Sequence, residues 1–114
     1  MTEFVVGVGR VTLHLRHAQS LKDKRRVVQS LMQKLRNEGF SAAETGYADE
    51  LKRASLGYTF AARSSNLVRR KVEEVDRLLV GDYLVVEHKR DVVDYSGEDV
   101  FDENPFRFLA DEED

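Results

Sequence analysis

Basic residues gather directly after Ser20, and their types and spacing suit contact with an anion. Lys22, Lys24 and Arg25 fall in the first turns of a predicted helix, where the helix dipole disfavours cations by up to about 1 kcal/mol each. A helix start that offers free N–H groups beside cations is a suitable binding site for phosphate. Locally unfavourable patterns of this kind are typical of functional sites.

The polar side of the same helix, which is predicted to end near Glu38, continues the basic pattern. Lys22, Arg26, Gln29, Gln33 and Arg36 recur at spacings of three and four, so they form one stripe opposite the core. A solvated helix face would give the same pattern and is the alternative interpretation. The residues predicted to contact phosphate are Ser20, Lys22, Lys24, Arg25, Arg26 and Arg36.

Charges in the second predicted helix have a simpler explanation. Arg69 and Glu73, Arg70 and Glu74, and Glu73 and Arg77 each lie four residues apart. Such pairs stabilise an exposed helix by about 0.2–0.5 kcal/mol each. We therefore interpret these charges as mostly structural.

Residues suited to catalysis form no recognised arrangement in this chain. There is no cysteine, which excludes a thiol nucleophile and thiolate metal ligation. His14, His17 and His88 lack the spacing of metal ligands and are interpreted as surface residues. No serine lies in a GxSxG sequence, and no pair of carboxylates has the apolar setting that separates two pKa values. We predict a protein that is not an enzyme and has no cofactor and no metal site.

Gly7 and Gly9 resemble the start of a dinucleotide-binding motif, but the third glycine is missing and both lie inside a predicted strand. Their alternation with Val11 and Leu13 places them on the inner face of that strand. Without side chains, they would let a neighbouring element approach closely. We favour this structural role over nucleotide binding.

Tyr58 and Phe60 in a later strand resemble the aromatic pattern of RNA-recognition motifs. Strand parity argues against that role, because both share a face with the apolar residues Ala54, Leu56 and Ala62. The two rings are therefore predicted to face the helices, leaving the sheet without a stacking platform.

The elements that must position these residues follow from apolar periodicity. Predicted strands cover residues 4–15, 40–45, 53–62 and 83–93. The two predicted helices begin after Ser20 and after Ser64, and are closed by Gly39 and by Gly81 with Asp82. The resulting βαββαβ order predicts an α+β, ferredoxin-like split βαβ domain over residues 1–94, with a four-stranded antiparallel sheet and two helices on one face.

Charge is divided unevenly along the chain. Residues 1–94 contain 17 Lys and Arg against 13 Asp and Glu, whereas residues 95–114 contain 1 against 8. The second segment has no apolar period and is predicted to be an acidic disordered tail. The chain shows neither a secretory signal nor a run of about 20 apolar residues that could span a bilayer. We therefore expect a soluble cytoplasmic protein. The uneven charge is typical of a basic body that binds a polyanion or of a tail that modulates such binding, and a solvated charged surface is the alternative interpretation.

The segment VGVGRVTLHLRHAQSLKDKRRVVQSLMQKLRN, followed by ETGYADELKRASLGY, resembles the YlxP-like family of small bacterial proteins of unknown function. The resemblance spans roughly Val5 to Val93, and its most specific part is SLKDKRRVVQSL, from Ser20 to Leu31. It implies a ferredoxin-like fold. Family members are often encoded beside transcription, translation-initiation and ribosome-maturation factors, which implies an accessory role near RNA or the ribosome without a catalytic residue.

Two classes of function remain open from the sequence. The first is a non-enzymatic, ribosome-associated accessory that binds structured RNA or ribonucleoprotein through the basic helix. The second is a protein-interaction or homodimerisation module that uses the open sheet face. That face would present Phe4, Val6 and Val8 beside the small residues Ser55, Gly57, Thr59 and Ala61. A small-ligand sensor is a third, weaker alternative.

Overall fold

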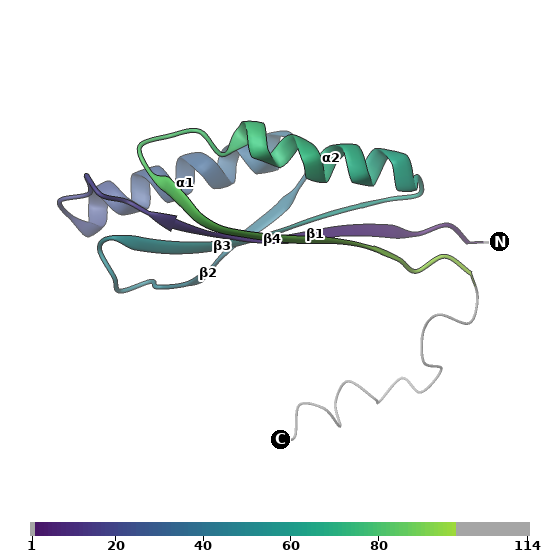
Figure 1. Cartoon of the computed structure of the whole chain (residues 1–114), viewed down its shortest axis with the longest axis horizontal. Coiled ribbons are helices and arrows are strands. Elements are labelled where there is room, and N and C mark those ends of the chain that lie inside the picture. Colours follow the sequence, from purple (N-terminus) through teal and green to yellow (C-terminus); the bar gives the residue numbers. More distant parts are fainter. Residues whose placement is uncertain (1, 98–114) are drawn as a thin grey trace, which may run out of the picture.

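A computed structural model describes residues 2–97 of the chain. Its elements are β1 (Val5–His14), α1 (Leu21–Asn37), β2 (Ser41–Gly46), β3 (Arg53–Ala62), α2 (Ser65–Leu78) and β4 (Leu84–Asp94) (Figure 1). This order confirms the predicted βαββαβ arrangement. Most of the predicted acidic tail, residues 98–114, lies outside the described residues, so its disorder stays a prediction.

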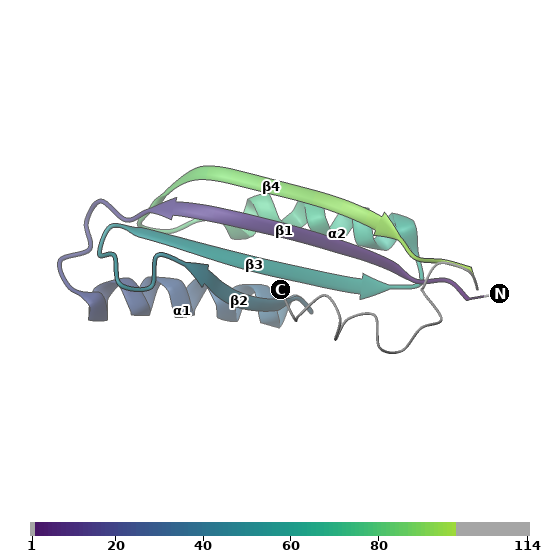
Figure 2. The same cartoon turned by 90° about the horizontal axis from the view of Figure 1, so that it is seen from below.

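The four strands form one sheet in the order β2-β3-β1-β4, and every neighbouring pair is antiparallel. Both helices pack on one face of this sheet (Figure 1), and the opposite face is open (Figure 2). β1 pairs along its whole length with β3 on one side and β4 on the other. The predicted α+β fold with an antiparallel sheet is therefore confirmed.

The core lies between the sheet and the helices, as the alternation of β1 predicts. Val11 and Leu13 of β1 are buried against a stripe of α1 that includes Val28, Leu31 and Leu35. Each fully buried side chain of this kind contributes roughly 1.5–3 kcal/mol. Val6, Val8 and the following even-numbered residues of β1 point to the open face.

Gly7 and Gly9 have the structural role predicted for them. A Cβ atom at Gly7 would lie 2.4 Å from Cγ2 of Val72, and one at Gly9 would lie 2.1 Å from Cζ of Tyr58. The two glycines therefore admit α2 and the Tyr58 ring against β1.

Tyr58 and Phe60 face the helices, which confirms the parity argument. Tyr58 is buried, and its ring meets Phe40 edge-on with the centroids 5.4 Å apart. The ring of Phe60 also packs on Phe40, at 5.3 Å. Neither ring is available on the open face for stacking.

The second helix ends earlier than the sequence predicted. α2 stops at Leu78, three residues before Gly81, and the φ and ψ angles of Leu79 are no longer helical. Gly81 instead makes room for Tyr83, whose ring would lie 2.4 Å from a Cβ atom at that position. Within residues 2–97, neither helix is long and apolar enough to cross a membrane.

Candidate nucleic-acid interface

The start of α1 is closed by its own side chains. The Ser20 hydroxyl accepts a hydrogen bond from the Asp23 N–H at 3.1 Å, and the Asp23 carboxylate accepts one from the Gln19 N–H at 3.2 Å. This is a reciprocal capping arrangement. Ser20 is therefore a helix cap, and the Asp23 carboxylate lies at the helix start where the sequence predicted a bound phosphate.

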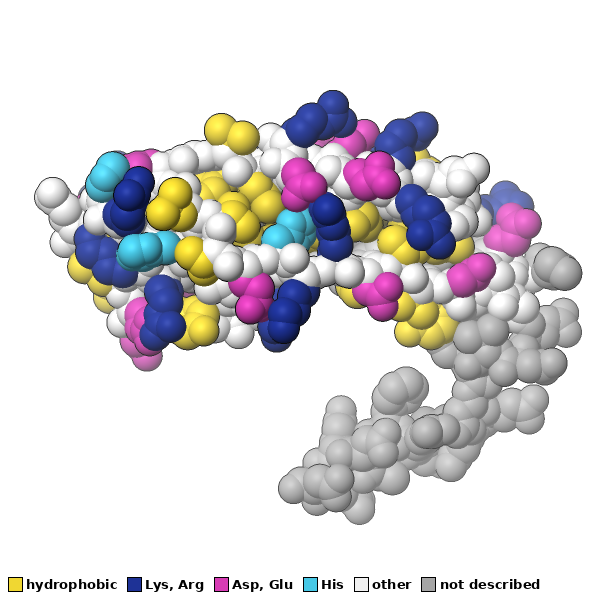
Figure 3. Space-filling view, viewed as in Figure 1, with side chains coloured by type: hydrophobic (Ala, Val, Ile, Leu, Met, Phe, Trp, Pro, Cys, Tyr) yellow, Lys and Arg dark blue, Asp and Glu magenta, His cyan; other side chains and the backbone are white. Residues whose placement is uncertain are grey.

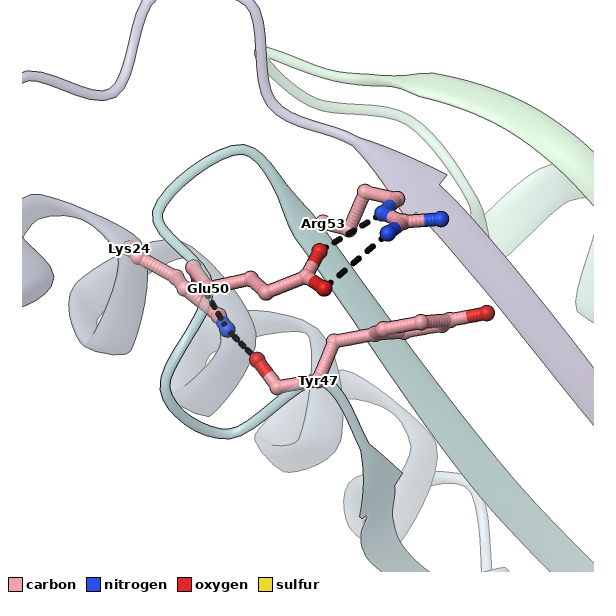
Figure 4. Close-up of polar contacts among 4 residues, drawn as sticks. All are labelled: Lys24, Tyr47, Glu50 and Arg53. Atoms are coloured by element: carbon pink, nitrogen blue, oxygen red, sulfur yellow. Dashed lines mark hydrogen bonds and ion pairs between the residues drawn. The ribbon is translucent and has the colours of Figure 1, made fainter.

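Lys24 lies in the interior, although the sequence predicted that it contacts phosphate. Lys24 is only 2% exposed. Its ammonium group donates hydrogen bonds to the carbonyl oxygens of Tyr47 and Glu50, the latter at 2.6 Å (Figure 4). Hydrogen bonds from a charged donor contribute about 1.5–3 kcal/mol. Lys24 therefore joins α1 to the loop between β2 and β3, and this finding removes it from the predicted phosphate-binding set.

Lys22, Arg25 and Arg26 remain on the outer surface of α1. All three side chains are exposed, and within residues 2–97 none of them forms a hydrogen bond or an ion pair. The helix around them carries six basic residues and one acidic residue, Asp23. The first half of α1 is therefore a surface of uncompensated positive charge, which we call the α1 cation group (Lys22, Arg25 and Arg26).

Arg36 is exposed but lies apart from the α1 cation group. At 1.5 Å per residue, ten helical positions separate it from Arg26 by about 15 Å. Its guanidinium group donates to the Ala42 carbonyl at 2.9 Å, and Lys34 donates to the Val80 carbonyl at 2.8 Å. These two cations tie α1 to neighbouring segments, so Arg36 has a structural contact that the sequence did not predict.

Some charges on α2 are compensated, but not by the predicted pairs four residues apart. Glu74 forms ion pairs with Lys71 at 3.6 Å and with Arg77 at 3.8 Å, both three residues away along the helix. Lys71 also forms an ion pair with Glu38, at the end of α1, at 3.3 Å. Its ammonium group lies over the ring of Phe60. Figure 3, drawn from the side of α2 and β4, shows basic and acidic side chains interspersed. Among the described residues, Arg69 and Arg70 of α2 also form no ion pair, although Arg69 donates to the Ser65 hydroxyl at 3.3 Å. The α1 cation group is distinguished by having three neighbouring cations without an ion pair.

His88, which the sequence predicted to be a surface residue, is mostly buried. Its side chain is 11% exposed and faces α2 instead of solvent. The Tyr58 hydroxyl lies 2.7 Å from Nε2 of His88, and the Asp76 carboxylate lies 3.2 Å from its Nδ1. Arg90 completes the group by donating to the other Asp76 oxygen at 2.8 Å. The sequence indicates this inward orientation, because His88 and Val92 lie four residues apart on one strand and therefore share a face of the sheet.

The protonation of this network follows from burial. A carboxylate accepts hydrogen bonds and cannot donate, so Nδ1 of His88 carries the proton and Nε2 accepts from Tyr58. Burial lowers the pKa of His88 and outweighs the neighbouring Asp76, which raises it. Burial also raises the pKa of Tyr58 to about 12. Both groups are therefore neutral near pH 7.

His17 behaves differently from His88, and the described part of the chain contains no candidate metal centre. His17 is exposed, as predicted, and its Nδ1 lies 2.9 Å from the Asp82 carboxylate. Within residues 2–97, no three His, Cys, Asp or Glu side chains are grouped so that they could hold a metal ion.

An antiparallel four-stranded sheet with two helices on one face places the chain among the α+β proteins of βαββαβ topology. Residues 6–91 match the family described as protein of unknown function (DUF503), and the chain belongs to that family. One similar solved structure is titled "De novo designed protein Foldit4"; it is 14% identical, with a TM-score of 0.43, and the match covers 84% of this chain and 100% of that one. No curated protein matches the sequence.

Proposed function

We propose that this protein is a non-enzymatic cytoplasmic accessory that binds structured RNA or ribonucleoprotein through the α1 cation group. One observation carries the proposal: Lys22, Arg25 and Arg26 are exposed side by side without an ion pair among the described residues. Cations held close together repel one another. An RNA backbone would supply the missing negative charge and release its counterions on binding.

The revised surface is smaller than the one predicted from sequence. Ser20 and Lys24 have structural contacts, and Arg36 lies on a later part of α1. Contacts made by cations alone recognise phosphates without reading bases. The resemblance to YlxP-like proteins, whose genes often neighbour those of ribosome-maturation factors, supports RNA as the polyanion.

A charge-reversal experiment tests this function. The test variant combines Lys22→Glu, Arg25→Glu and Arg26→Glu. The control combines Arg69→Glu, Arg70→Glu and Arg77→Glu, which reverses equal charge on α2. Affinity for a duplex RNA hairpin is measured by fluorescence anisotropy over a range of salt concentrations. Each lost phosphate contact should reduce the slope of log affinity against log salt by about 0.7–0.9.

The expected result is weaker binding and a smaller salt slope for the α1 variant than for the α2 variant. Equal losses in the two variants would show that net charge alone matters, and would overturn the assignment of the site to α1. A wild-type protein that does not bind the hairpin at low salt would overturn the RNA-binding function itself.

Homodimerisation through the open sheet face is the second candidate. Val6 and Val8 point to this face, and Val6 pairs with Val93 of β4. Phe4 lies at the same end, with its ring centroid 6.1 Å from that of Tyr95. These side chains form an apolar region on a face that neither helix covers, and a second copy of the chain would supply an equal one.

A further inference from the structure

A hollow of about 440 Å³ lies on the open face of the sheet, at the opposite end from Phe4. Three polar residues lie in one row across its floor: Ser55 of β3 pairs with Thr12 of β1, and Thr12 pairs with Glu87 of β4. Arg10 stands at its side, opposite Gly57, where a Cβ atom would lie 3.0 Å from Cγ2 of Thr45. The hollow is therefore mainly polar and is lined by residues of all four strands.

Tyr47 forms one wall of this hollow and has a backbone that the fold holds firmly. Among the non-glycine residues of the described chain it alone has a positive φ, of 61°. That conformation costs roughly 1–3 kcal/mol and persists where surrounding contacts enforce it. Here the Tyr47 carbonyl oxygen accepts hydrogen bonds from the buried Lys24 ammonium group and from the Glu50 N–H, the latter at 3.0 Å.

The ring of Tyr47 also has a contact within the fold. The guanidinium carbon of Arg53 lies 4.4 Å from the ring centroid, and Arg53 donates twice to the Glu50 carboxylate, at 2.6 and 2.9 Å (Figure 4). Tyr47 is still 39% exposed. One loop thus presents an aromatic ring, stacked on a cation, at the edge of a polar hollow.

The polar groups around the hollow suit a neutral heterocycle better than a phosphate. Arg10 donates to Glu87 at 3.3 Å, so the hollow offers a carboxylate acceptor beside a guanidinium donor. Hydroxyls of Thr45 and Ser55, 2.9 Å apart, can donate or accept. A phosphate would be repelled by Glu87, whereas the edge of a base has both donors and acceptors and its face stacks on aromatic rings.

We propose that this hollow binds an unpaired RNA base, stacked on Tyr47 and hydrogen-bonded at its edge by Arg10 and Glu87. The choice of RNA over a free nucleotide rests on the function proposed for the α1 cation group. Lys24 links the two surfaces, since its backbone lies between Lys22 and Arg25 while its ammonium group holds Tyr47. An RNA strand that passes around the loop between β2 and β3 would meet both.

The ring is tested with two variants, Tyr47→Leu and Tyr47→Phe, whose folding is checked by circular dichroism. Tyr47→Phe keeps the aromatic face and serves as the matched control. The probe is a ten-nucleotide single-stranded oligoadenylate, and the comparison probes are the same strand with abasic sites, the duplex hairpin and adenosine monophosphate. Loss of one stacked base should weaken oligoadenylate binding by roughly 5- to 150-fold in Tyr47→Leu.

The expected pattern is weak binding of oligoadenylate by Tyr47→Leu, near wild-type binding by Tyr47→Phe, and equal binding of the duplex by all three proteins. Equal affinity of the wild type for the intact and abasic strands, or unchanged affinity of Tyr47→Leu, would overturn the base site. Adenosine monophosphate binding as tightly as the strand would assign the hollow to a free nucleotide. If the α1 charge reversal leaves RNA binding unchanged, the proposed function is overturned. The Tyr47 variants and the abasic strand still decide whether the hollow binds a base.

Discussion

The hydroxyl of Tyr58 lies 2.7 Å from Nε2 of His88, which joins β3 to β4 across the intervening strand β1. The contact passes over Gly9, where a Cβ atom would lie 2.2 Å from the Tyr58 oxygen. The hydrogen bond between β3 and β4 therefore requires a glycine at this position of β1, the strand between them.

Stability should fall as the pH drops below about 6.5, the ordinary pKa of an unfolded histidine. Because burial lowers the pKa of His88 in the folded state, the unfolded chain binds its proton first. The stabilisation is complete above the unfolded pKa and is lost as the pH falls towards the folded pKa. Urea denaturation of the wild type and of His88→Gln from pH 8 to pH 5 measures this. An equal pH dependence in both proteins would contradict the argument.

Replacing Lys24 by methionine should destabilise the fold by about 1–3 kcal/mol, because the Glu50 carbonyl loses its charged donor. Lys22→Met is the matched control, since Lys22 is an exposed lysine two residues away, and its change should stay within about 0.5 kcal/mol. Urea denaturation midpoints at a common slope give both values. Equal midpoints for the two variants would show that the Lys24 contacts contribute nothing to stability.

The open face gives a prediction about mass in solution. If a second copy covers Val6 and Val8, the combination of Val6→Lys and Val8→Lys should give monomers with the fold intact, because buried like charges repel. Sedimentation at high micromolar concentration reports the mass. Gln29→Lys with Gln33→Lys on exposed positions of α1 is the control and should leave it unchanged. A wild type that sediments as a monomer would contradict this dimer.

The charge of residues 95–114, eight acidic against one basic, gives a prediction about competition with RNA. A chain that ends at Tyr95 should bind the duplex hairpin more tightly than the full chain at low salt, because a linked polyanion competes for the same cations. The difference should vanish above roughly 0.5 M salt, where screening acts over a few Å. Equal affinity of the two chains at low salt would show that this segment does not compete.

Strand alternation made the arrangement of the sheet predictable from sequence. It placed Tyr58 and Phe60 inward and gave Gly7 and Gly9 a packing role, because a period of two assigns each residue to a face. It also separated Val6 and Val8 from the core. These features depend on neighbours in the sequence and on a repeating geometry.

Lys24 and His88 could not be assigned by charge type alone, since their partners lie on distant segments. Lys24 continues the core spacing of Val28, Leu31 and Leu35, a signal that its charge concealed. The hydrogen-bond acceptors that make its burial stable are carbonyls of a loop more than twenty residues away. The spacing of Ser20 and Asp23 is that of a helix cap, and the capping contacts use N–H groups that a phosphate would otherwise bind.

The position of β1 has a consequence for how the chain folds during synthesis. The first strand to be made is one of the two inner strands, and Val8 pairs with Thr59 and Asp91, both far later in the chain. Until those segments leave the ribosome, the apolar residues of β1 have no strand to pair with. Contacts between distant residues slow folding. The edge strand β4 can therefore complete the sheet only at the end of the domain's synthesis.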